Sequence, residues 1–540
     1  MSLLDALLLD SHRMNIWVAV RRDSNRGCGT RADPYHAGGA DHFDALMNSF
    51  AEFTTILLGP GTFQTRGFSD DATTGWQPKR GMKIIGSGID VTTLQLVGAG
   101  SDHHHYFAIG HKLASLSDPG VQVDYFEASD FTIDCNLNEV GGASCARGAV
   151  RVKGNHARLR RLKAIQWGTK SSQKPCYVLA LITGDPEAGI PEIENAGMEQ
   201  CLAIDPASGG GVSEPCTLFH AGGKEEAMAL KEIYGLNPFI RNCHADAGQE
   251  VPSTKDYRAL SMGWCQGGVV EGNEVRNCKM GGPYQEKAGT LSIIVRNNSY
   301  RNVTRGPYWN QGALYPAMAE ELTSLQYVVG NPSVALATTS ASDHGLQPGE
   351  RVKVDADGSS PGQFKGVFVI LDIPAANQFR YQMDSAPGQN ATDGSFQKVI
   401  GVSRMLVENN TIELAGENSD EAGIQLHDGN LPAQEPGHAH GDVIVRNNIL
   451  GYVDATFDAA NEGDGIAIHG ARNLRIEGNQ VDVAQEPIQD LRCGSVRHFD
   501  NRGPAGALLA REDPDTGREI EEVDAAAEDA LVAALYEKHG

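Results

Sequence analysis

The feature that most constrains this chain is an imperfect internal repeat, in which a short strand rich in Val and Ile runs into a polar pair that ends in asparagine. In one copy, residues 443–446 read Val-Ile-Val-Arg and precede Asn447 and Asn448. The closing asparagine recurs at equivalent positions of five segments: Asn273, Asn298, Asn410, Asn448 and Asn479. Repeats of about 20 to 50 residues are typical of solenoids. We therefore expect each copy to form one coil of an elongated all-β fold.

The recurring asparagine has a physical role in such a coil. A strand that alternates Val or Ile with charged residues buries one face and exposes the other. The asparagine that follows lies where the chain bends, because Asn tolerates left-handed backbone angles. Stacked on its equivalents, its amide can donate to one neighbour and accept from the other, whereas a lone buried amide costs about 1–3 kcal/mol. The five asparagines are thus predicted to form a structural ladder.

A second element recurs in phase with the first. The segments 423–427 and 465–469 begin with glycine, end in histidine and lie upstream of asparagine-bearing strands, and 148–153 precedes strand 157–162 in the same way. Each coil should therefore contain a glycine-led strand, a turn and an asparagine-bearing strand. His427 and His469 occupy matching positions, so we expect them to stack. Parallel stacking of such coils leaves only two ends to cap.

Four short motifs carry a resemblance to a known family. They are the start of a helix at 43–47, a strand closing in Pro-Gly-Thr-Phe at 55–63, Ile-Ile-Gly-Ser-Gly at 84–88 with Thr93-Leu94, and Phe-Thr-Ile-Asp-Cys-Asn at 131–136. Over residues 15–325 and 404–505 the chain resembles the pectate-lyase-like (pectin-lyase-fold) superfamily. The resemblance implies a right-handed parallel β-helix. It implies little about activity, because the motifs are structural.

The periodicity also suggests a domain organisation. We predict an N-terminal segment and capping helix at 1–54, a first part of the β-helix at 55–325 with long loops at 171–262, an inserted module at 326–403, the last coils at 404–508, and a helix or tail at 509–540. A short helix is expected near 225–231. In the last segment, apolar residues recur at the spacing of an amphipathic helix: Ile520, Val523, Ala527, Leu531, Ala534 and Leu535. We expect this helix to cap the final coil or, alternatively, to dock on a partner.

The inserted module has a different pattern. Alternating strands between 334 and 381 are joined by Pro-Gly and Asp-Gly turns, which indicates a small antiparallel β unit. Its motifs resemble those of a small β domain in phage structural proteins. The resemblance implies an adhesive or assembly module that projects sideways from one coil.

Composition excludes several classes of function. The chain has 540 residues and a formal charge of −24, so its surface should repel nucleic acid. No apolar run reaches the roughly 18–20 residues of a membrane span. The opening residues 1–10 lack a basic leader and a cleavage site, so we expect no signal peptide and a protein made in the cytoplasm. The sequence does not determine its final location, which could be a virion or another particle. The ten cysteines form no Cys-x-x-Cys pair, so reduced thiols in the core are expected.

A basic run supplies the first candidate site. Residues 147–163 contain seven Lys or Arg side chains and no acidic residue. We expect Arg151 and Lys153 to point outward while Val150 and Val152 face the core. They could bind a sugar carboxylate or sulfate and are candidate catalytic residues, together with Glu286. The alternative is a solvated face that is paired with acidic loops at 185–214.

Two Gly-Pro-Tyr turns, at 282–284 and 306–308, supply the second candidate site, because turns 24 residues apart should stack on one edge of the solenoid. Aromatic faces beside amides suit sugar rings. The predicted carbohydrate-binding residues are Tyr284, Gln285, Glu286, Tyr308, Trp309 and Asn310. The alternative is a hydrophobic stack of turns that is covered by the inserted module.

Other ionisable residues are scattered. Carboxylates that could act as a glycosidase pair if they converged lie at strand ends and turns: Asp246, Asp256, Glu271, Glu286, Asp428 and Asp464. The histidines at 103–105 alternate along a strand, so a single metal site there is awkward. We predict no structural zinc and no cofactor, and no motif supports Ca²⁺. The arginine and aspartate patterns of pectate lyases and polygalacturonases are absent.

These observations support three functional hypotheses. The first is a glycan-recognising β-helix in a spike, fibre or particle surface of phage-tail type, as a trimer or larger assembly. The second is an enzyme, either a polysaccharide lyase or a glycoside hydrolase, that acts in a groove on the β-helix. The third is a scaffold without a carbohydrate role.

Overall fold

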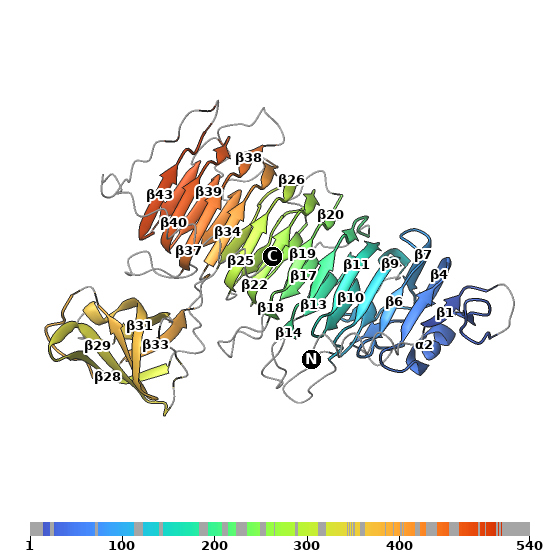
Figure 1. The fold of residues 1–540 in the computed structure, drawn as a ribbon, viewed down its shortest axis with the longest axis horizontal. Coiled ribbons are helices and arrows are strands. Elements are labelled where there is room, and N and C mark those ends of the chain that lie inside the picture. The colour runs from blue at the N-terminus through green and yellow to red at the C-terminus, as the bar shows by residue number, and fades with distance from the viewer. Residues whose placement is uncertain are drawn as a thin grey trace.

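We analysed a computed structural model of the chain. It describes residues 15–509 except 22–25, 71–73, 113–121, 140–143, 183–192, 208–213, 223–234, 249–254, 264, 287–289, 311–319, 357–361, 416–421, 428–439, 453–463, 484–486 and scattered positions within 343–350, 384–403 and 492–508. The helices predicted near 225–231 and at 509–540 lie outside the described residues, apart from Leu509. The described strands form a right-handed parallel β-helix with a separate β-barrel beside it (Figure 1).

Sheet A holds the asparagine-bearing strands of each coil and the short strands that follow them. The former are β22 (Cys265–Glu271), β25 (Thr290–Arg296), β34 (Arg404–Glu408), β37 (His440–Arg446), β40 (Ala471–Glu477) and β43 (Ser495–Phe499). The latter are β23 (Glu274–Arg276), β26 (Ser299–Val303), β35 (Thr411–Leu414), β38 (Ile449–Tyr452) and β41 (Gln480–Val481). Each strand pairs in parallel with its counterpart in the next coil.

Sheet B is built from the glycine-led strands that the sequence predicted. In order along the solenoid they include β8 (His105–Gly110), β10 (Ala146–Lys153), β13 (Cys176–Ile182), β17 (Cys216–Gly222), β21 (Tyr257–Ser261), β24 (Tyr284–Glu286), β27 (Tyr308–Asn310), β36 (Ile424–His427), β39 (Ile466–His469) and β42 (Ile488–Leu491). One continuous apolar core runs between the two sheets. The rings of His427 and His469 are neighbours in adjacent coils, as predicted, and meet edge to face with centroids 4.4 Å apart.

The N-terminal coils follow the family-like motifs. Strands β3 (Thr55–Leu58), β6 (Lys83–Ile85), β9 (Glu127–Asp134) and β11 (Arg158–Ile165) pair in succession in sheet A, and β1 (Asn15–Ala19) precedes them. The predicted capping helix is α2 (Ala40–Ser49). It buries Phe43 and Met47, and the Phe43 ring lies 5.7 Å from the ring of Phe63.

Residues 171–262 differ from the expected long loops. Besides β13, β17 and β21 they contain β15 (Gly197–Glu199) and β19 (Phe239–Arg241), which continue sheet A between β11 and β22. The repeat went unrecognised because Cys201 and Cys243, rather than asparagine, stand two residues after the paired Glu199 and Arg241. The backbone N–H of Cys243 donates to Oδ1 of Asn273 (2.9 Å), so the cysteines occupy the same line as the ladder.

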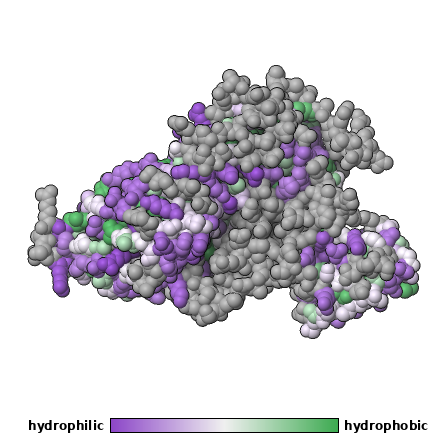
Figure 2. All heavy atoms as spheres, turned by 180° about the vertical axis from the view of Figure 1, so that it is seen from behind, coloured by the Kyte–Doolittle hydropathy of each residue, from purple (hydrophilic) through white to green (hydrophobic). Residues whose placement is uncertain are grey.

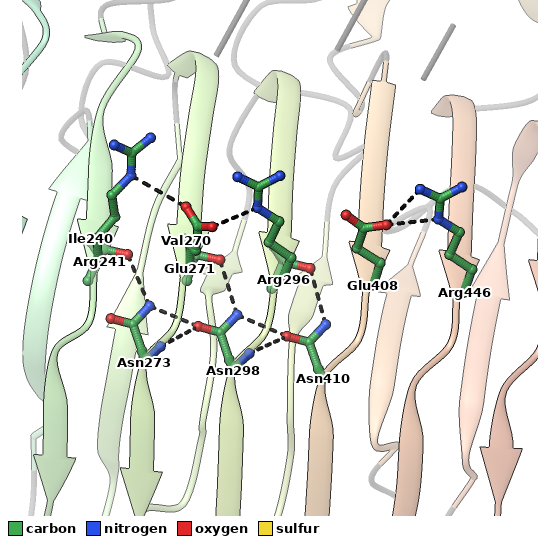
Figure 3. A network of polar contacts seen from close by, with 11 residues as sticks. Ile240, Arg241, Val270, Glu271, Asn273, Arg296, Asn298, Glu408, Asn410 and Arg446 are labelled. Carbon is green, nitrogen blue, oxygen red and sulfur yellow. Dashed lines mark hydrogen bonds and ion pairs between the residues drawn. The ribbon is translucent and has the colours of Figure 1, made fainter. Parts of the chain in front are cut away.

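The asparagine ladder is confirmed, and Asn501 extends it by one member. Figure 3 shows three of its residues, Asn273, Asn298 and Asn410. The side-chain Nδ2 of Asn273 donates to Oδ1 of Asn298 (2.9 Å), and the same bond joins every later pair. The full ladder is Asn273, Asn298, Asn410, Asn448, Asn479 and Asn501. Each Nδ2 also donates to a strand carbonyl of the preceding coil. The amides are therefore buried with their hydrogen-bonding groups satisfied.

The bend of each coil was assigned to the wrong residue of the polar pair. The positive φ angles belong to the first residue, at 56° for Asn297 and 54° for both Asn409 and Asn447. Glycine takes this place at 272 and 478 with φ near 60°. The first residue thus turns the chain and the second makes the ladder. The first position requires a positive φ and the second requires a side-chain amide, and asparagine meets both requirements, which explains why Asn-Asn recurs.

A row of alternating charges runs beside the ladder on the outer face of sheet A (Figure 3). Register places in it Arg160, Glu199, Arg241, Glu271, Arg296, Glu408, Arg446 and Glu477, one from each coil. Glu271 lies between Arg241 (3.7 Å) and Arg296 (2.9 Å). Stacked charges of alternating sign neutralise neighbours that parallel pairing places on the same line.

The inserted module is antiparallel, as its turn pattern predicted, and its strands close into a barrel. Its strands are β28 (Glu320–Val328), β29 (Asn331–Thr339), β30 (Arg351–Ala356), β31 (Gly366–Ala375), β32 (Gln378–Gln382) and β33 (Gly394–Val399). Aromatic residues fill it, among them Phe379, Tyr381 and Phe396. The solenoid continues across the insertion, because β25 pairs directly with β34.

Hydrophilic residues cover most of the described surface on the face shown in Figure 2, as the charge of −24 leads one to expect. All ten cysteines are free thiols, and eight of them are buried. Among the described residues, no helix has the length and apolar character required to cross a membrane.

Candidate binding face on sheet B

Strand alternation divides sheet B into a core side and an outer side. Val150, Leu179, Phe219 and Leu260 are in register and pack in the core. The residue after each of them points outward. The resulting outer row consists of Arg151, Ala180, His220, Ser261, Tyr284, Tyr308 and Gln425. Residues more than 270 positions apart in the sequence thus share one line.

Arg151 is the unsatisfied cation of this row. Its guanidinium lies over the ring of Phe107, 5.6 Å from the centroid, and the side chain is half-buried. Its Nε has no hydrogen-bond partner, and among the described residues it makes no ion pair. Burial lowers the pKa of Arg151, since removal from water disfavours the charged form. A cation in this state favours an anionic ligand that supplies the missing partner.

Two strands further along, three side chains capable of proton transfer meet. The edge of the His220 ring faces the ring of Tyr177, with centroids 5.4 Å apart. Nδ1 of His220 lies 3.0 Å from Oγ of Ser261. His220 and Ser261 are almost fully buried beneath this face. No sequence pattern pointed to them, because they belong to different coils and are joined only by register.

Tyr284, a predicted sugar-binding residue, is buried rather than open. Only 4% of it is exposed, and the guanidinium of Arg258 lies 4.3 Å from its ring centroid. Arg258 is held in turn by a two-pronged contact with Asp256, at 3.1 and 2.8 Å. One face of the Tyr284 ring is therefore already occupied by a cation. Asp256 is thus held in an ion pair with Arg258.

The remaining residues of the aromatic edge are placed by backbone register alone. Tyr284, Gln285 and Glu286 pair with Tyr308, Trp309 and Asn310, so the two turns stack as predicted. Tyr308 is in register with outward-facing Gln425, whereas Trp309 is in register with Leu426, a core residue. The side chains of Gln285, Glu286, Tyr308, Trp309 and Asn310 lie outside the described set.

The basic run at 147–163 divides between three environments. On sheet A its cations are paired: Arg160 with Glu199, Arg161 with Asp130 and Lys163 with Asp90. Arg147 is buried and donates to backbone carbonyls, including those of Leu96 and Gly98. Lys153, which was expected to point outward beside Arg151, is only 1% exposed and is therefore not open to solvent. Val150 and Val152 do face the core.

A polar cluster closes the N-terminal end of sheet B. Asp70 accepts from Nδ1 of His104 (3.0 Å) and contacts Nδ1 of His105 (3.1 Å). The two histidines reach one carboxylate because His103 has a φ of 61°, which breaks the strand alternation assumed from the sequence. Burial opposes ionisation of Asp70, but the hydrogen bonds from His105 and His104 outweigh it and lower its pKa. In the described part of the chain, no three His, Cys, Asp or Glu side chains group so as to hold a metal ion.

Solved structures with the same architecture are known, although no family model and no curated protein sequence matches the chain. A double mutant of the tailspike protein of E. coli bacteriophage HK620, in complex with a pentasaccharide, is 10% identical with a TM-score of 0.50, over 94% of this chain and 69% of that chain. A polygalacturonase from Erwinia carotovora ssp. carotovora is 8% identical with a TM-score of 0.44, over 94% and 96% of the two chains. The A-module of the mannuronan C-5 epimerase AlgE4 of Azotobacter vinelandii is 11% identical with a TM-score of 0.34, over 87% and 91%. The likeness to the tailspike supports the parallel β-helix fold and concerns the fold alone.

Proposed function

We propose that this protein binds an acidic polysaccharide along the outer face of sheet B, as a component of a spike, fibre or other particle surface. The observation that carries the proposal is Arg151, a half-buried guanidinium that makes no ion pair among the described residues. On the outer face of sheet A, by contrast, cations such as Arg241, Arg296 and Arg446 meet carboxylates. A sugar carboxylate or sulfate would give Arg151 the ionic partner that it lacks. The arginines on sheet A already have carboxylate partners and need no such ligand.

The shape of the face also supports a polymeric ligand. The outer row continues from Arg151 through Tyr284 to Gln425, and adjacent strands of a sheet are about 4.8 Å apart. Seven strands therefore extend over roughly 29 Å, which suits an extended chain of several sugar units better than a single small molecule. Tyr177 provides an aromatic ring beside this row, in contact with the ring of His220. The assembly role is supported by the β-barrel, whose sequence resembles modules of phage structural proteins.

The binding proposal is tested by measuring the affinity of the whole protein for immobilised acidic and neutral polysaccharides. Arg151→Ala should lower affinity for the acidic ligand about tenfold or more, since a charge-assisted contact contributes about 1.5–3 kcal/mol. Arg161→Ala is the matched control, because Arg161 is already paired with Asp130 on the other sheet. Equal loss in both variants, or no binding to any acidic polysaccharide, contradicts the proposal.

A second candidate function is a polysaccharide lyase, favoured by the contact of His220 with Tyr177 and Ser261 on the same face. In such a reaction a base removes the C5 proton of a uronate while a cation stabilises the carboxylate that gains charge. The C4–O bond then breaks, the leaving oxygen takes up a proton, and an unsaturated uronate remains. His220 or Tyr177 could move the protons and Arg151 could face the carboxylate. Hydrolysis is less well supported, since Asp256, a candidate carboxylate immediately before β21, is held in an ion pair by Arg258.

The two functions are separated by product analysis. A lyase generates the ultraviolet absorbance of an unsaturated uronate, and His220→Ala should abolish it while retaining affinity. Binding without this absorbance and without new reducing ends supports the recognition function and excludes both the lyase and the hydrolase. Native mass measurement reports whether the protein forms a trimer or a larger assembly.

A further inference from the structure

An apolar row lies on the outer wall of sheet A. Val270, Val295, Val407 and Val445 pack in the core, so the residue before each of them points outward. These outward residues are Val269, Ile294, Leu406 and Ile444, paired strand by strand, and we call them the outer apolar stripe. They are 4%, 1%, 0% and 5% exposed, respectively. They are thus as buried as core residues although they point away from the core.

The described apolar side chains outside the stripe do not account for this burial. Ile294, Leu406 and Ile444 form a hydrophobic cluster separate from the main core, and no other described apolar side chain packs in it. The rows on both sides are polar, with Arg296 and Glu408 on one side and Arg404 and Asp442 on the other. An apolar stripe enclosed by charged rows is typical of a docking surface for an amphipathic element.

We propose that residues 520–535 form an amphipathic helix that lies lengthwise on the outer apolar stripe. This segment carries the six apolar residues at helical spacing: Ile520, Val523, Ala527, Leu531, Ala534 and Leu535. Sixteen helical residues span about 24 Å. The outer apolar stripe covers three strand intervals, or about 14 Å, and its row continues through Arg475 to Arg497 over five intervals, or about 24 Å. The helix is therefore long enough to cover the whole stripe and to reach the last strand of sheet A.

Two apolar segments lie outside the described residues, 520–535 and 1–14. The position of the last coil favours 520–535 as the one that covers the outer apolar stripe. The backbone N–H of Leu509 donates to the carbonyl of Asn501, so the chain reaches residue 510 beside the last coil. Ile444 lies only two strands from that coil, or about 10 Å. The other apolar segment, residues 1–14, precedes β1, which lies seven strand pairings or about 34 Å from β22. A 14-residue helix covers only about 21 Å, so this segment is too short to reach the outer apolar stripe.

Charge complementarity supports the same occupant. Residues 511–540 contain ten Asp or Glu and three Lys or Arg. The row of the stripe continues into Arg475 and Arg497, and Arg404 lies exposed on its flank. Acidic positions beside the apolar ones would face these cations, of which Arg475 is also paired with Glu477. Ile294 and Leu406 belong to the two coils on either side of the insertion. A helix packed across both residues would stabilise the contact between these coils.

Photo-crosslinking of the full chain tests the placement. With p-benzoylphenylalanine at position 536 in place of Tyr536, irradiation should attach residue 536 to β22 or β25 within the same chain. At position 520 the attachment should shift to β37 or β40. Attachment of both positions only to β43 means that the segment caps the last coil, and attachment to a second copy means that the partner's segment docks. Either result overturns the proposal, as does the absence of attachment to sheet A.

Hydrogen exchange supplies a second readout that does not depend on crosslinking. Amides of 520–535 should be protected, and Leu531→Asp should speed their exchange at least tenfold. Leu8→Asp is the control in the other apolar segment and should leave that exchange unchanged. Unprotected amides in the unsubstituted protein, or an equal effect of Leu8→Asp, would show that the stripe has another occupant.

Discussion

Asn298 donates through Nδ2 to Oδ1 of Asn410 at 2.9 Å, although 112 residues separate them in the sequence. The bond has the same length as that from Asn410 to Asn448, which crosses an ordinary coil of 38 residues. The barrel is therefore an excursion from one coil that leaves the stacking of the solenoid unchanged. Register between β25 and β34 is set by their own side chains, not by the length of chain between them.

This relationship predicts that the barrel is dispensable for the β-helix. Replacing residues 320–399 with a short Gly/Ser linker should leave the thermal midpoint within a few degrees, because all contacts between β25 and β34 come from the solenoid itself. Melting followed by circular dichroism measures it. Loss of the cooperative transition would mean that the barrel holds the two parts of the solenoid together.

Removing one asparagine from the middle of the ladder should be costly. Asn298→Ala deprives both the backbone N–H and Nδ2 of Asn273 of their acceptor and leaves the carbonyl of Val270 without its donor. Buried groups left without partners cost about 1–3 kcal/mol each, so we expect a loss of at least about 2 kcal/mol in a denaturant titration. Asn138→Ala, at an exposed position, should change stability by less than about 0.5 kcal/mol. Equal effects would contradict the energetic role of the ladder.

Acid should destabilise the fold partly through His111. Burial lowers its pKa to about 4, and its Nε2 accepts from the backbone N–H of Lys153 at 2.8 Å. The unfolded chain, with a His pKa near 6.5, takes up this proton first as pH falls. The contribution is therefore complete above about pH 6.5 and is lost toward pH 4, by up to about 3 kcal/mol.

The pH dependence is checked by urea titrations between pH 4 and 7.5. His111→Gln should flatten the dependence relative to the unsubstituted protein, even if the variant is less stable at neutral pH. His440, with a pKa lowered to about 3 by burial, should contribute in the same direction. An unchanged slope in the His111 variant would show that the residue titrates normally in the folded state.

The cysteines should differ sharply in reactivity. Cys28 is exposed, whereas burial raises the pKa of Cys135 and Cys278 and keeps their thiols protonated. A thiol-specific reagent should modify one cysteine rapidly in the native protein and the eight buried ones only after unfolding, with half-buried Cys493 between these limits. Cys28→Ser should remove the fast phase. A second fast thiol would reveal local opening of the core.

The sequence alone was sufficient to predict the stacked coils, the capping helix, the inserted antiparallel module and the ladder positions from Asn273 to Asn479. These features depend on local patterns, namely alternation with a period of two and a polar pair at each bend, and local patterns are visible in one chain. The pattern failed over 171–262 because Cys201 and Cys243 replace the asparagine, and it assigned the left-handed angle to the second residue of the pair instead of the first.

The candidate site was decided by tertiary structure. Arg151, His220 and Tyr284 share one row only because the coils between them vary in length while the strands stay in register. No spacing in the sequence encodes that row, and none shows that Arg161 is paired, that Lys153 is buried or that Arg151 makes no ion pair. Alternation determines which side chains leave the core. Which partner each one meets outside depends on stacking between coils, and that is a non-local property of the fold.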